Sequence, residues 1–267
     1  MVDIKKVVIT LTTVAERLSD TKYGENGIIS CIKSLQNQSY TDFEIHFNIP
    51  YISAYSMEKY VIPDWLHQFD KVKIFRMDDL GAATKIIPTI ERITNPETII
   101  IVCDDDLVYH EDMVKEHVKN QSERDCAFGY DSLGTDEPKF NDVRDYFVVS
   151  VPFEMSGKIM QHYKTVSYKR RYFEDDFFTE FTGKTKSDDI LLSAYMNKQG
   201  IKKIVMPYEN EAKLETLEEW RGKGGVTTFP VLRHAHHDLG DGCRDPRCVE
   251  IQVPFFVPEE FKIKQYI

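Results

Sequence analysis

The stretch ETIIIVCDDDLVYHEDM, residues 97–113, decides the fold class of this chain. An unbroken apolar run ends in Asp104, Asp105 and Asp106, and a helical pattern follows. A short apolar run of this kind is typical of a strand buried on both faces of a sheet. Ligands of open α/β sheets bind beyond the carboxyl ends of the strands. The stretch therefore predicts a central strand whose carboxyl end carries an acidic site, where a divalent cation would relieve the repulsion between three carboxylates.

Strand and helix patterns alternate on both sides of this stretch. Strands are predicted at 5–12, 42–50, 70–77, 126–132, 145–153, 202–207 and 226–237. Helices are predicted at 25–40, 83–95, 110–122 and 187–200. The alternation favours an α/β fold with a mostly parallel sheet. The charged and aromatic segment 167–186 shows no clear period, so that a surface loop and a mobile flap over a substrate both stay open.

Composition narrows the classes of function. The chain has 267 residues, 42% of them hydrophobic, which is enough for one large α/β domain. The net charge of -10 disfavours a nucleic-acid partner, because such proteins usually carry a basic patch. We find no apolar run of the roughly 20 residues that span a membrane, and no signal peptide. A cytoplasmic protein is expected.

The five cysteines fit that compartment. Cys31 and Cys103 lie in apolar patterns and are expected to be buried thiols. Cys243 and Cys248 lie in a loop rich in Gly and Asp, where a disulfide, a metal site and free thiols all stay open. Reduced thiols are favoured, because no secretory signal accompanies them.

The stretch 99–114, IIIVCDDDLVYHEDMV, resembles the DxD region of nucleotide-sugar glycosyltransferases with the GT-A fold. Other stretches resemble the same family in the expected order, so that the resemblance extends over roughly residues 4–205. They are VVITLTTVAERL (7–18), IISCIKSLQNQSYTDFEIHFNIP (28–50), MDDLGAATKIIPTIE (77–91) and KSDDILLSAYM (186–196). Family-2-like enzymes of bacteria and large DNA viruses are the most similar members.

The resemblance implies a role for each matching residue at the donor site. Asp106 would bind the metal, Asp104 would approach the metal or the ribose, and Asp105 would lie nearer the sugar. Further donor-binding residues implied are Thr12, Arg17, Asp79 and Lys85. Arg17 and Lys85 are also compatible with solvated positions on helices, and Asp79 with a surface turn.

The resemblance also implies a catalytic base at the start of the helix 187–200. Ser187 is the expected N-cap and Gly200 ends the helix, which puts Asp188 and Asp189 in the first turn. Asp189 would be the base, and Asp188 would position the acceptor or the donor sugar. Acids in a first turn are also favoured by the helix dipole alone.

A late histidine often completes the metal site in this family. In RHAHHDLGDG, residues 233–242, His234 and His236 are two residues apart and share a face of the predicted strand. His236 is the first candidate ligand and His234 the second. Hydrogen-bonded or exposed histidines at a polar strand end stay open as the alternative.

The fold class implied is α/β: a GT-A, Rossmann-like, mostly parallel central sheet with helices on both faces and an irregular C-terminal part. Residues 1–267 would form one domain, with a donor half at about 1–125, an acceptor and catalytic half at about 126–240, and a tail at 241–267. The activity implied is the transfer of a sugar from a nucleotide-diphosphate sugar, expected to be a UDP-sugar, to a hydroxyl of a glycan or glycoconjugate. Mn²⁺ or Mg²⁺ would be the cofactor, and the configuration would be inverted.

Other functions are compatible with the same residues. DDDLV, residues 104–108, fits the D-x-D-x-[TV] pattern of haloacid-dehalogenase-like phosphatases, in which Asp104 would be the nucleophile. That motif normally lies near the start of a domain, whereas here about a hundred residues precede it. A non-catalytic nucleotide-sugar-binding module also stays open. A nucleotidyltransferase would need a Gly-rich phosphate loop near the start, and TLTTVAERL has none.

Overall fold

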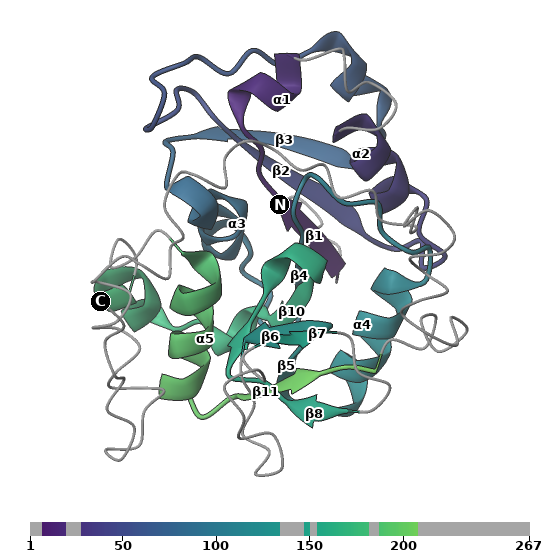
Figure 1. Ribbon diagram of the computed structural model, residues 1–267, viewed down its shortest axis with the longest axis vertical. Coiled ribbons are helices and arrows are strands. Elements are labelled where there is room, and N and C mark those ends of the chain that lie inside the picture. Colours follow the sequence, from purple (N-terminus) through teal and green to yellow (C-terminus); the bar gives the residue numbers. More distant parts are fainter. Residues whose placement is uncertain (1–6, 20–27, 134–146, 150–153, 182–186, 208–267) are drawn as a thin grey trace.

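The computed structural model describes residues 7–19, 28–133, 147–149, 154–181 and 187–207. Its centre is an eight-stranded sheet with the order β3-β2-β1-β4-β10-β5-β11-β8 (Figure 1). The strands are β1 (Val7–Leu11), β2 (Glu44–Pro50), β3 (Val72–Met77), β4 (Ile99–Val102), β5 (Cys126–Gly129), β8 (Met155–Ser156), β10 (Val166–Lys169) and β11 (Lys202–Val205).

The sheet is mixed but mostly parallel. β1 pairs in parallel with β2 and β4, β2 with β3, and β5 with β11. β10 runs antiparallel to both of its neighbours, β4 and β5, and β8 runs antiparallel to β11. All described strands of this sheet except β8 and β10 therefore point the same way. The predicted α/β class with a mostly parallel central sheet is confirmed.

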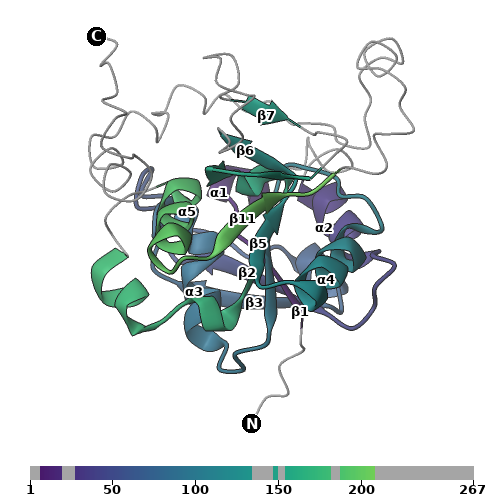
Figure 2. The ribbon, with the colours of Figure 1, turned by 90° about the horizontal axis from the view of Figure 1, so that it is seen from below.

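Helices cover both faces of the sheet. Figure 2 shows α3 and α5 on one side of it and α2 and α4 on the other. The α-helices are α1 (Ala15–Ser19), α2 (Ile28–Gln36), α3 (Ile87–Arg92), α4 (Met113–Glu123) and α5 (Asp188–Lys198). Shorter helical segments are η2 (Asp64–Gln68), η3 (Gly81–Lys85), η5 (His162–Lys164), η6 (Arg170–Tyr172) and η7 (Phe177–Phe181). A second sheet has the order β7-β6-β9, formed by Phe147–Val149, Asp131–Leu133 and Ile159–Met160.

The alternation of side chains along β1 and β4 explains the two layers. Val7 and Ile9 pack into the core that α1, α2 and α4 cover, whereas Val8 packs into the core that α3 and α5 cover. In β4, Ile101 belongs to the first core and Ile100 to the second. Fully burying an aliphatic side chain of this size contributes roughly 1.5–3 kcal/mol. Burial on both faces therefore holds β4 in the middle of the sheet, and with it the position of the acids that follow.

The ends of α5 lie where the sequence predicted them. Ser187 is the N-cap, and its hydroxyl accepts a hydrogen bond from the Ile190 N–H at 3.5 Å. Gly200 has a φ of 68°, the left-handed conformation that ends many helices. Because α5 leads into β11, which is parallel to β5, its first turn lies at the carboxyl edge of the sheet. The predicted N-cap and C-terminal glycine of this helix are confirmed, and the structure places its acidic first turn at the carboxyl edge.

The segment 167–186 is not the surface loop or flap that the sequence analysis considered, as far as residue 181. Its first residues belong to β10, which lies between β4 and β5 with Val166 opposite both Val102 and Gly129. Tyr168, Phe173 and Phe177 are buried in the core beside α5. The charged residues that follow β10 hide its period, because a four-residue strand shows only two inward side chains.

Some predictions lie outside the described residues: the strand 226–237, the histidines His234 and His236, the pair Cys243 and Cys248, and the C-terminal tail. Cys31 and Cys103 are free and buried, as expected, and so is Cys126. Within the described ranges, no helix has both the length and the apolar character needed to cross a membrane.

Candidate active site

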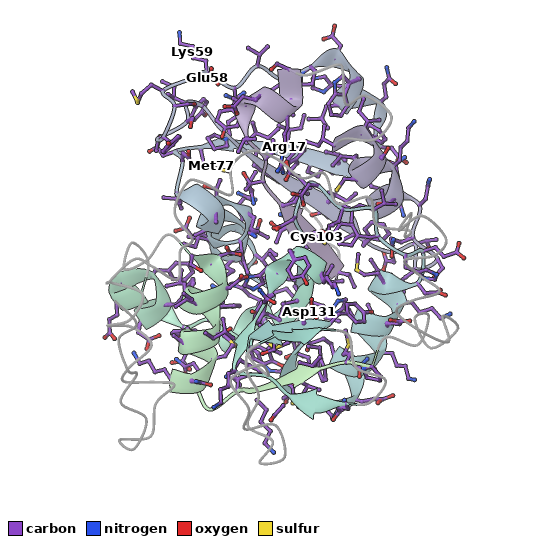
Figure 3. The ribbon with its side chains drawn as sticks, in the orientation of Figure 1. Arg17, Glu58, Lys59, Met77, Cys103 and Asp131 are labelled. Atoms are coloured by element: carbon purple, nitrogen blue, oxygen red, sulfur yellow. The ribbon has the colours of Figure 1, made fainter. Side chains whose placement is uncertain are left out.

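The acids at the end of β4 lie where the carboxyl ends of the parallel strands meet. Asp105 is buried, with 5% of its surface exposed, whereas the side chains of Asp104 and Asp106 are 30% and 23% exposed. In Figure 3 the labels of Arg17 and of Cys103, the residue before Asp104, mark this region near the middle of the molecule. Two of the three carboxylates are thus open to a ligand while the middle one is packed inside.

Arg17 and Thr13 hold the second and third acids of this triplet. Arg17 Nη1 and Thr13 Oγ1 both donate to the carboxylate of Asp105. Arg17 Nη2 lies 3.2 Å from Asp106 Oδ2. β1 and β4 are neighbouring parallel strands, so the segments that follow them meet at one edge. The guanidinium of Arg17 therefore forms ion pairs with two carboxylates, those of Asp105 and Asp106.

Too little positive charge lies beside these three carboxylates to balance their negative charge. Burial, followed by the repulsion of Asp104 and Asp105, raises the pKa of Asp106 to about 7, although Arg17 opposes the shift. Burial also raises the pKa of Asp105, against the opposing effects of Arg17 and Thr13. Burial disfavours the charged form of Arg17, but its three acidic neighbours outweigh that effect and raise its pKa. The group would bind a further cation favourably.

Lys85, at the end of η3, joins the acidic end of β4 to the first turn of α5. Its Nζ lies 2.5 Å from Asp104 Oδ1 and 2.9 Å from Asp188 Oδ2, and its side chain is 7% exposed. Burial disfavours the ammonium, but Asp104, Asp188 and Asp189 outweigh that effect and raise its pKa well above the usual value. Lys85 therefore stays charged and bridges acids that are far apart in the sequence.

A buried polar network fixes the backbone at Lys85. The Lys85 carbonyl accepts hydrogen bonds from Thr10 Oγ1 and, at 3.1 Å, from Asn48 Nδ2. Asn48 Nδ2 also donates to Thr89 Oγ1 at 2.9 Å, and Asn48 Oδ1 accepts from Arg92 Nη2 at 2.6 Å. Buried polar groups are costly unless they are paired, so this network holds the chain in one position. The lysine is thereby aimed at the carboxylates by β1, β2 and α3 together.

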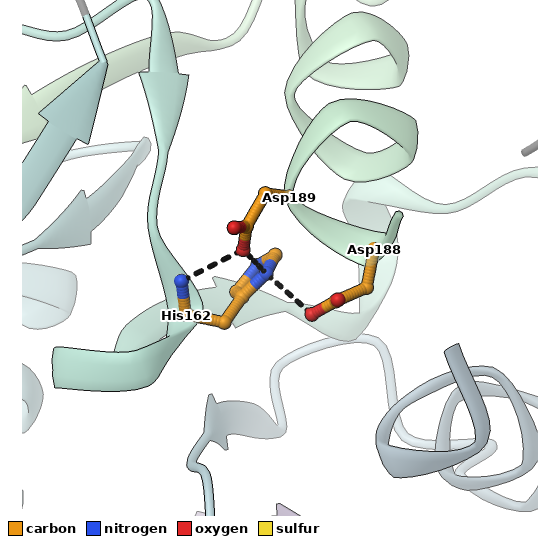
Figure 4. A group of neighbouring side chains, drawn as sticks. All are labelled: His162, Asp188 and Asp189. Atoms are coloured by element: carbon orange, nitrogen blue, oxygen red, sulfur yellow. Dashed lines mark hydrogen bonds and ion pairs between the residues drawn. The ribbon is translucent and has the colours of Figure 1, made fainter. Parts of the chain in front are cut away.

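His162 lies between the two aspartates of α5 (Figure 4). Its Nδ1 is 2.8 Å from Asp188 Oδ2 and 2.6 Å from Asp189 Oδ1, and its backbone N–H donates to the same Asp189 oxygen at 2.9 Å. Nδ1 makes no hydrogen bond to either carboxylate, so these two contacts are ion pairs. The ring therefore lies between two carboxylates and forms an ion pair with each.

The electrostatics of this second group favour ion pairs. His162 is fully buried, which lowers its pKa, but Asp188 and Asp189 outweigh burial and raise the pKa to about 9. Burial acts to raise the pKa of Asp188, but Lys85 and His162 outweigh it and hold that pKa below its usual value. His162 is therefore an imidazolium and Asp188 a carboxylate over the ordinary pH range.

The two ends of this site differ in how well their residues suit a metal ion. His162, Asp188 and Asp189 offer ligand atoms within 4.8 Å of one another. The separations of 2.6 and 2.8 Å are those of close ion pairs. Ligands of one Zn²⁺ or Mg²⁺ ion stand about 2.9–3.4 Å apart, given bond lengths near 2.0–2.1 Å. Because Lys85 also contacts Asp188, we assign an imidazolium there. Asp104 and Asp106, with accessible carboxylates and a deficit of positive charge, fit a hard divalent cation.

The remaining predicted site residues take other positions. Thr12 Oγ1 donates to the Asn48 carbonyl at 2.7 Å. Asp79 organises the loop after β3, because its carboxylate accepts from the N–H groups of Ala54 and Gly81, at 2.9 and 2.8 Å. His236 and His234 lie outside the described residues. The structure thus brings Arg17, Lys85, both acidic groups and their neighbours together, and places Thr12 and Asp79 in supporting contacts.

Sequence reasoning missed two residues of the site, Thr13 and His162. Thr13 is adjacent to the predicted Thr12, and a strand-end loop gives no means of choosing between neighbours. His162 reaches the site because β10 runs antiparallel to β4, so that the segment before β10 arrives at the carboxyl edge. Its only local signal was a lone histidine in 154–165, a segment with no clear period.

Comparisons with known proteins found likeness in structure alone. No family model matches the sequence, and no curated protein matches it. A structure of S. aureus TarS in complex with UDP-GlcNAc has 11% identity and a TM-score of 0.45, covering 74% of this chain and 55% of TarS. The 4-diphosphocytidyl-2C-methyl-D-erythritol synthase of Anaerococcus prevotii has 12% identity and a TM-score of 0.46, covering 74% and 83%. A Desulfovibrio desulfuricans protein described as a nucleotide-diphospho-sugar transferase has 9% identity and a TM-score of 0.43, covering 75% and 79%. The chain spans 57% of the first matched TarS structure.

Proposed function

We propose that this chain is a metal-dependent glycosyltransferase that moves a sugar from a UDP-sugar to a hydroxyl of a glycan or glycoconjugate, with inversion. One observation carries the proposal: a deficit of positive charge at the carboxyl edge of the sheet. Five carboxylates lie beside three cationic side chains in two adjoining clusters, one around Arg17 and one around Lys85 and His162, so that carboxylates outnumber cations by two. Together the clusters comprise Asp104, Asp105, Asp106, Asp188, Asp189, Arg17, Lys85 and His162. A single divalent cation would balance this excess.

The donor end would be formed by Asp104, Asp106, Arg17 and Lys85. A divalent cation held by Asp104 and Asp106 would stabilise the negative charge that develops on the leaving diphosphate. Lys85, which lies 2.5 Å from Asp104, is placed next to these ligands and would face phosphate oxygens. Arg17 would contribute a second positive group beside Asp106. His236 or His234 would add a ligand from the late strand, which stays a prediction.

The acceptor end would be formed by Asp189. Its side chain is 30% exposed, whereas that of Asp188 is 6% exposed and is bound by Lys85 and His162. A general base must reach the hydroxyl whose proton it takes, so the more exposed acid suits that role. Asp188 would fix the distance between the two ends of the site through Lys85. We propose that the donor half comprises about residues 1–125 and the acceptor half about residues 126–240.

The proposed function is tested by binding and by turnover. In a thermal-shift screen of nucleotide sugars, a UDP-sugar together with Mn²⁺ should raise the melting temperature, because a ligand that binds only the folded state stabilises it. The same donor should then be consumed, with release of UDP, when glycan acceptors are added. Release of phosphate from simple monoesters would instead favour the phosphatase alternative. Binding without turnover of any acceptor would favour a non-catalytic module.

Lys85→Met is expected to weaken binding of UDP in the presence of Mn²⁺. Methionine keeps the unbranched stem but removes a charge-assisted contact worth about 1.5–3 kcal/mol. Arg17→Met should act in the same direction. Isothermal titration calorimetry measures the effect, well below the melting temperature of each variant. Lys33→Met, on the exposed side of α2, removes the same charge and serves as the control. Unchanged UDP affinity in both site variants would contradict the roles of Lys85 and Arg17.

A further inference from the structure

His162 is a buried group that the donor site does not use. It belongs to η5, just before β10, and both of its ring nitrogens have polar neighbours. Nε2 lies 2.9 Å from the hydroxyl of the buried Tyr168, and Nδ1 faces Asp188 and Asp189. The ring is therefore held from both ends, by a tyrosine of the central sheet and by two acids of α5 (Figure 4).

The contacts of His162 distinguish the two oxygens of Asp189. Asp189 Oδ1 accepts from the backbone N–H of His162 at 2.9 Å and lies 2.6 Å from its Nδ1. In the described part of the chain, Asp189 Oδ2 accepts no hydrogen bond, and Figure 4 shows it turned away from the ring. One residue thus fixes one oxygen twice and leaves the other available to a substrate.

We propose that His162 is a positioning residue that holds Asp189 in a single orientation, with Oδ1 bound and Oδ2 presented to the acceptor hydroxyl. This inference rests on the proposed function, in which Asp189 takes the proton. His162 would act through Asp189 and not on the substrate. Tyr168 makes the arrangement rigid, because it packs within the aromatic core beside α5. The centres of the Tyr168 and Phe173 rings are 5.6 Å apart.

The arrangement also requires the charged imidazolium, because a neutral imidazole has no positive charge with which to attract the two carboxylates. The groups that face His162 are Asp188 and Asp189 from α5 and Tyr168 from β10, with Lys85 of η3 behind Asp188. Burial raises the pKa of Tyr168 well above its usual value, and Lys85 likewise stays charged. His162, with a pKa of about 9, is the group that loses its proton first as the pH rises. The kcat for transfer should therefore fall as the pH rises through about 9.

His162→Asn tests the inference, because asparagine places an amide nitrogen near the position of Nδ1 but cannot carry a proton charge. We expect kcat to fall by about 10²-fold, the effect of a small misplacement of a catalytic group, and the fall of kcat near pH 9 to disappear. The KM for the donor and the affinity for UDP should stay unchanged, since the donor end is untouched. Wild-type kcat in His162→Asn would overturn the inference while leaving the proposed function intact.

His117→Asn is the matched control for the loss of a buried histidine. His117 is fully buried too, but its nitrogens face the hydroxyls of Thr165 and Ser167 and no carboxylate. This variant should keep the wild-type kcat and the fall near pH 9. A loss of kcat equal to that of His162→Asn would indicate a general packing effect and overturn the inference.

A measurement on the wild-type protein keeps the test decisive if His162→Asn does not fold. Nitrogen-15 NMR distinguishes an imidazolium from a neutral ring. His162 should be an imidazolium at pH 8, whereas His117, whose pKa burial lowers to about 3, should be neutral at pH 6. A neutral His162 at pH 7 would overturn the inference. If no donor and acceptor are turned over by the wild type, the proposed function fails and the inference fails with it.

Discussion

Asp106→Asn is expected to abolish sugar transfer and the Mn²⁺-dependent part of UDP binding, and to raise the melting temperature of the metal-free protein. Asparagine keeps the shape of the side chain but removes the charge that a divalent cation needs. Loss of one group that stabilises developing charge costs about 10²–10³-fold in kcat, and loss of the cation itself costs several kcal/mol of transition-state stabilisation. Calorimetry with UDP, with and without Mn²⁺, measures the binding part.

The stability part of this prediction depends on pH. The pKa of Asp106 is raised from 3.8 to about 7 in the folded protein, so the folded state holds the proton more tightly than the unfolded state does. Asp106 therefore contributes a loss of stability to the metal-free wild type as the pH rises from about 4 to about 7. Asp106→Asn does not undergo this pH-dependent loss of stability. In chelator, the excess of its melting temperature over that of the wild type should be largest above pH 7 and vanish below about pH 4. Asp78→Asn, an exposed acid after β3, carries the same change in net charge and should show none of these effects. Full turnover in excess chelator would contradict the metal role.

Asp189→Asn is expected to reduce transfer by the ~10²–10⁴-fold that general-base catalysis supplies. The amide keeps the shape of the side chain and its contact with the His162 N–H, but it cannot accept the proton of the acceptor hydroxyl. Donor affinity should stay close to that of the wild type. The melting temperature should fall less than in Asp188→Asn, because the side chain of Asp189 is 30% exposed although it faces the buried His162. Initial rates of UDP release at saturating donor and acceptor measure the effect. Transfer at close to the wild-type rate would show that the base lies elsewhere, first at Asp188.

Asp188→Asn is the informative comparison, because the two aspartates are adjacent and differ in what they contact. Asp188 is bound by Lys85 and His162 at 2.9 and 2.8 Å and is buried. Removing one charge from a buried ion pair typically costs about 3–5 kcal/mol of the free energy of unfolding. This variant should therefore lower the melting temperature strongly, whereas Asp189→Asn should lower the rate. Equal effects of the two variants on both quantities would contradict the assignment of separate roles.

Local signals in the sequence were sufficient for the framework of this site. The apolar run before Asp104 predicted β4, and its burial on both faces is what such a run records. Ser187 and Gly200 marked the ends of α5, because capping depends on a few neighbouring residues. From these elements followed the mostly parallel sheet and an acidic group at its carboxyl edge.

The partners within the site were decided by the tertiary structure. Lys85 was expected to face a phosphate, and the fold pairs it with Asp104 and Asp188, the second of which lies far along the chain. The position of β10 between β4 and β5 brings His162 to Asp189. The charged segment after β10 contains no pattern that predicts this position. The physical reason is that periodicity and caps report whether a residue is buried and how the local chain turns. Which distant carboxylate a buried cation meets depends on strand order and register, and these are set by packing of the whole core.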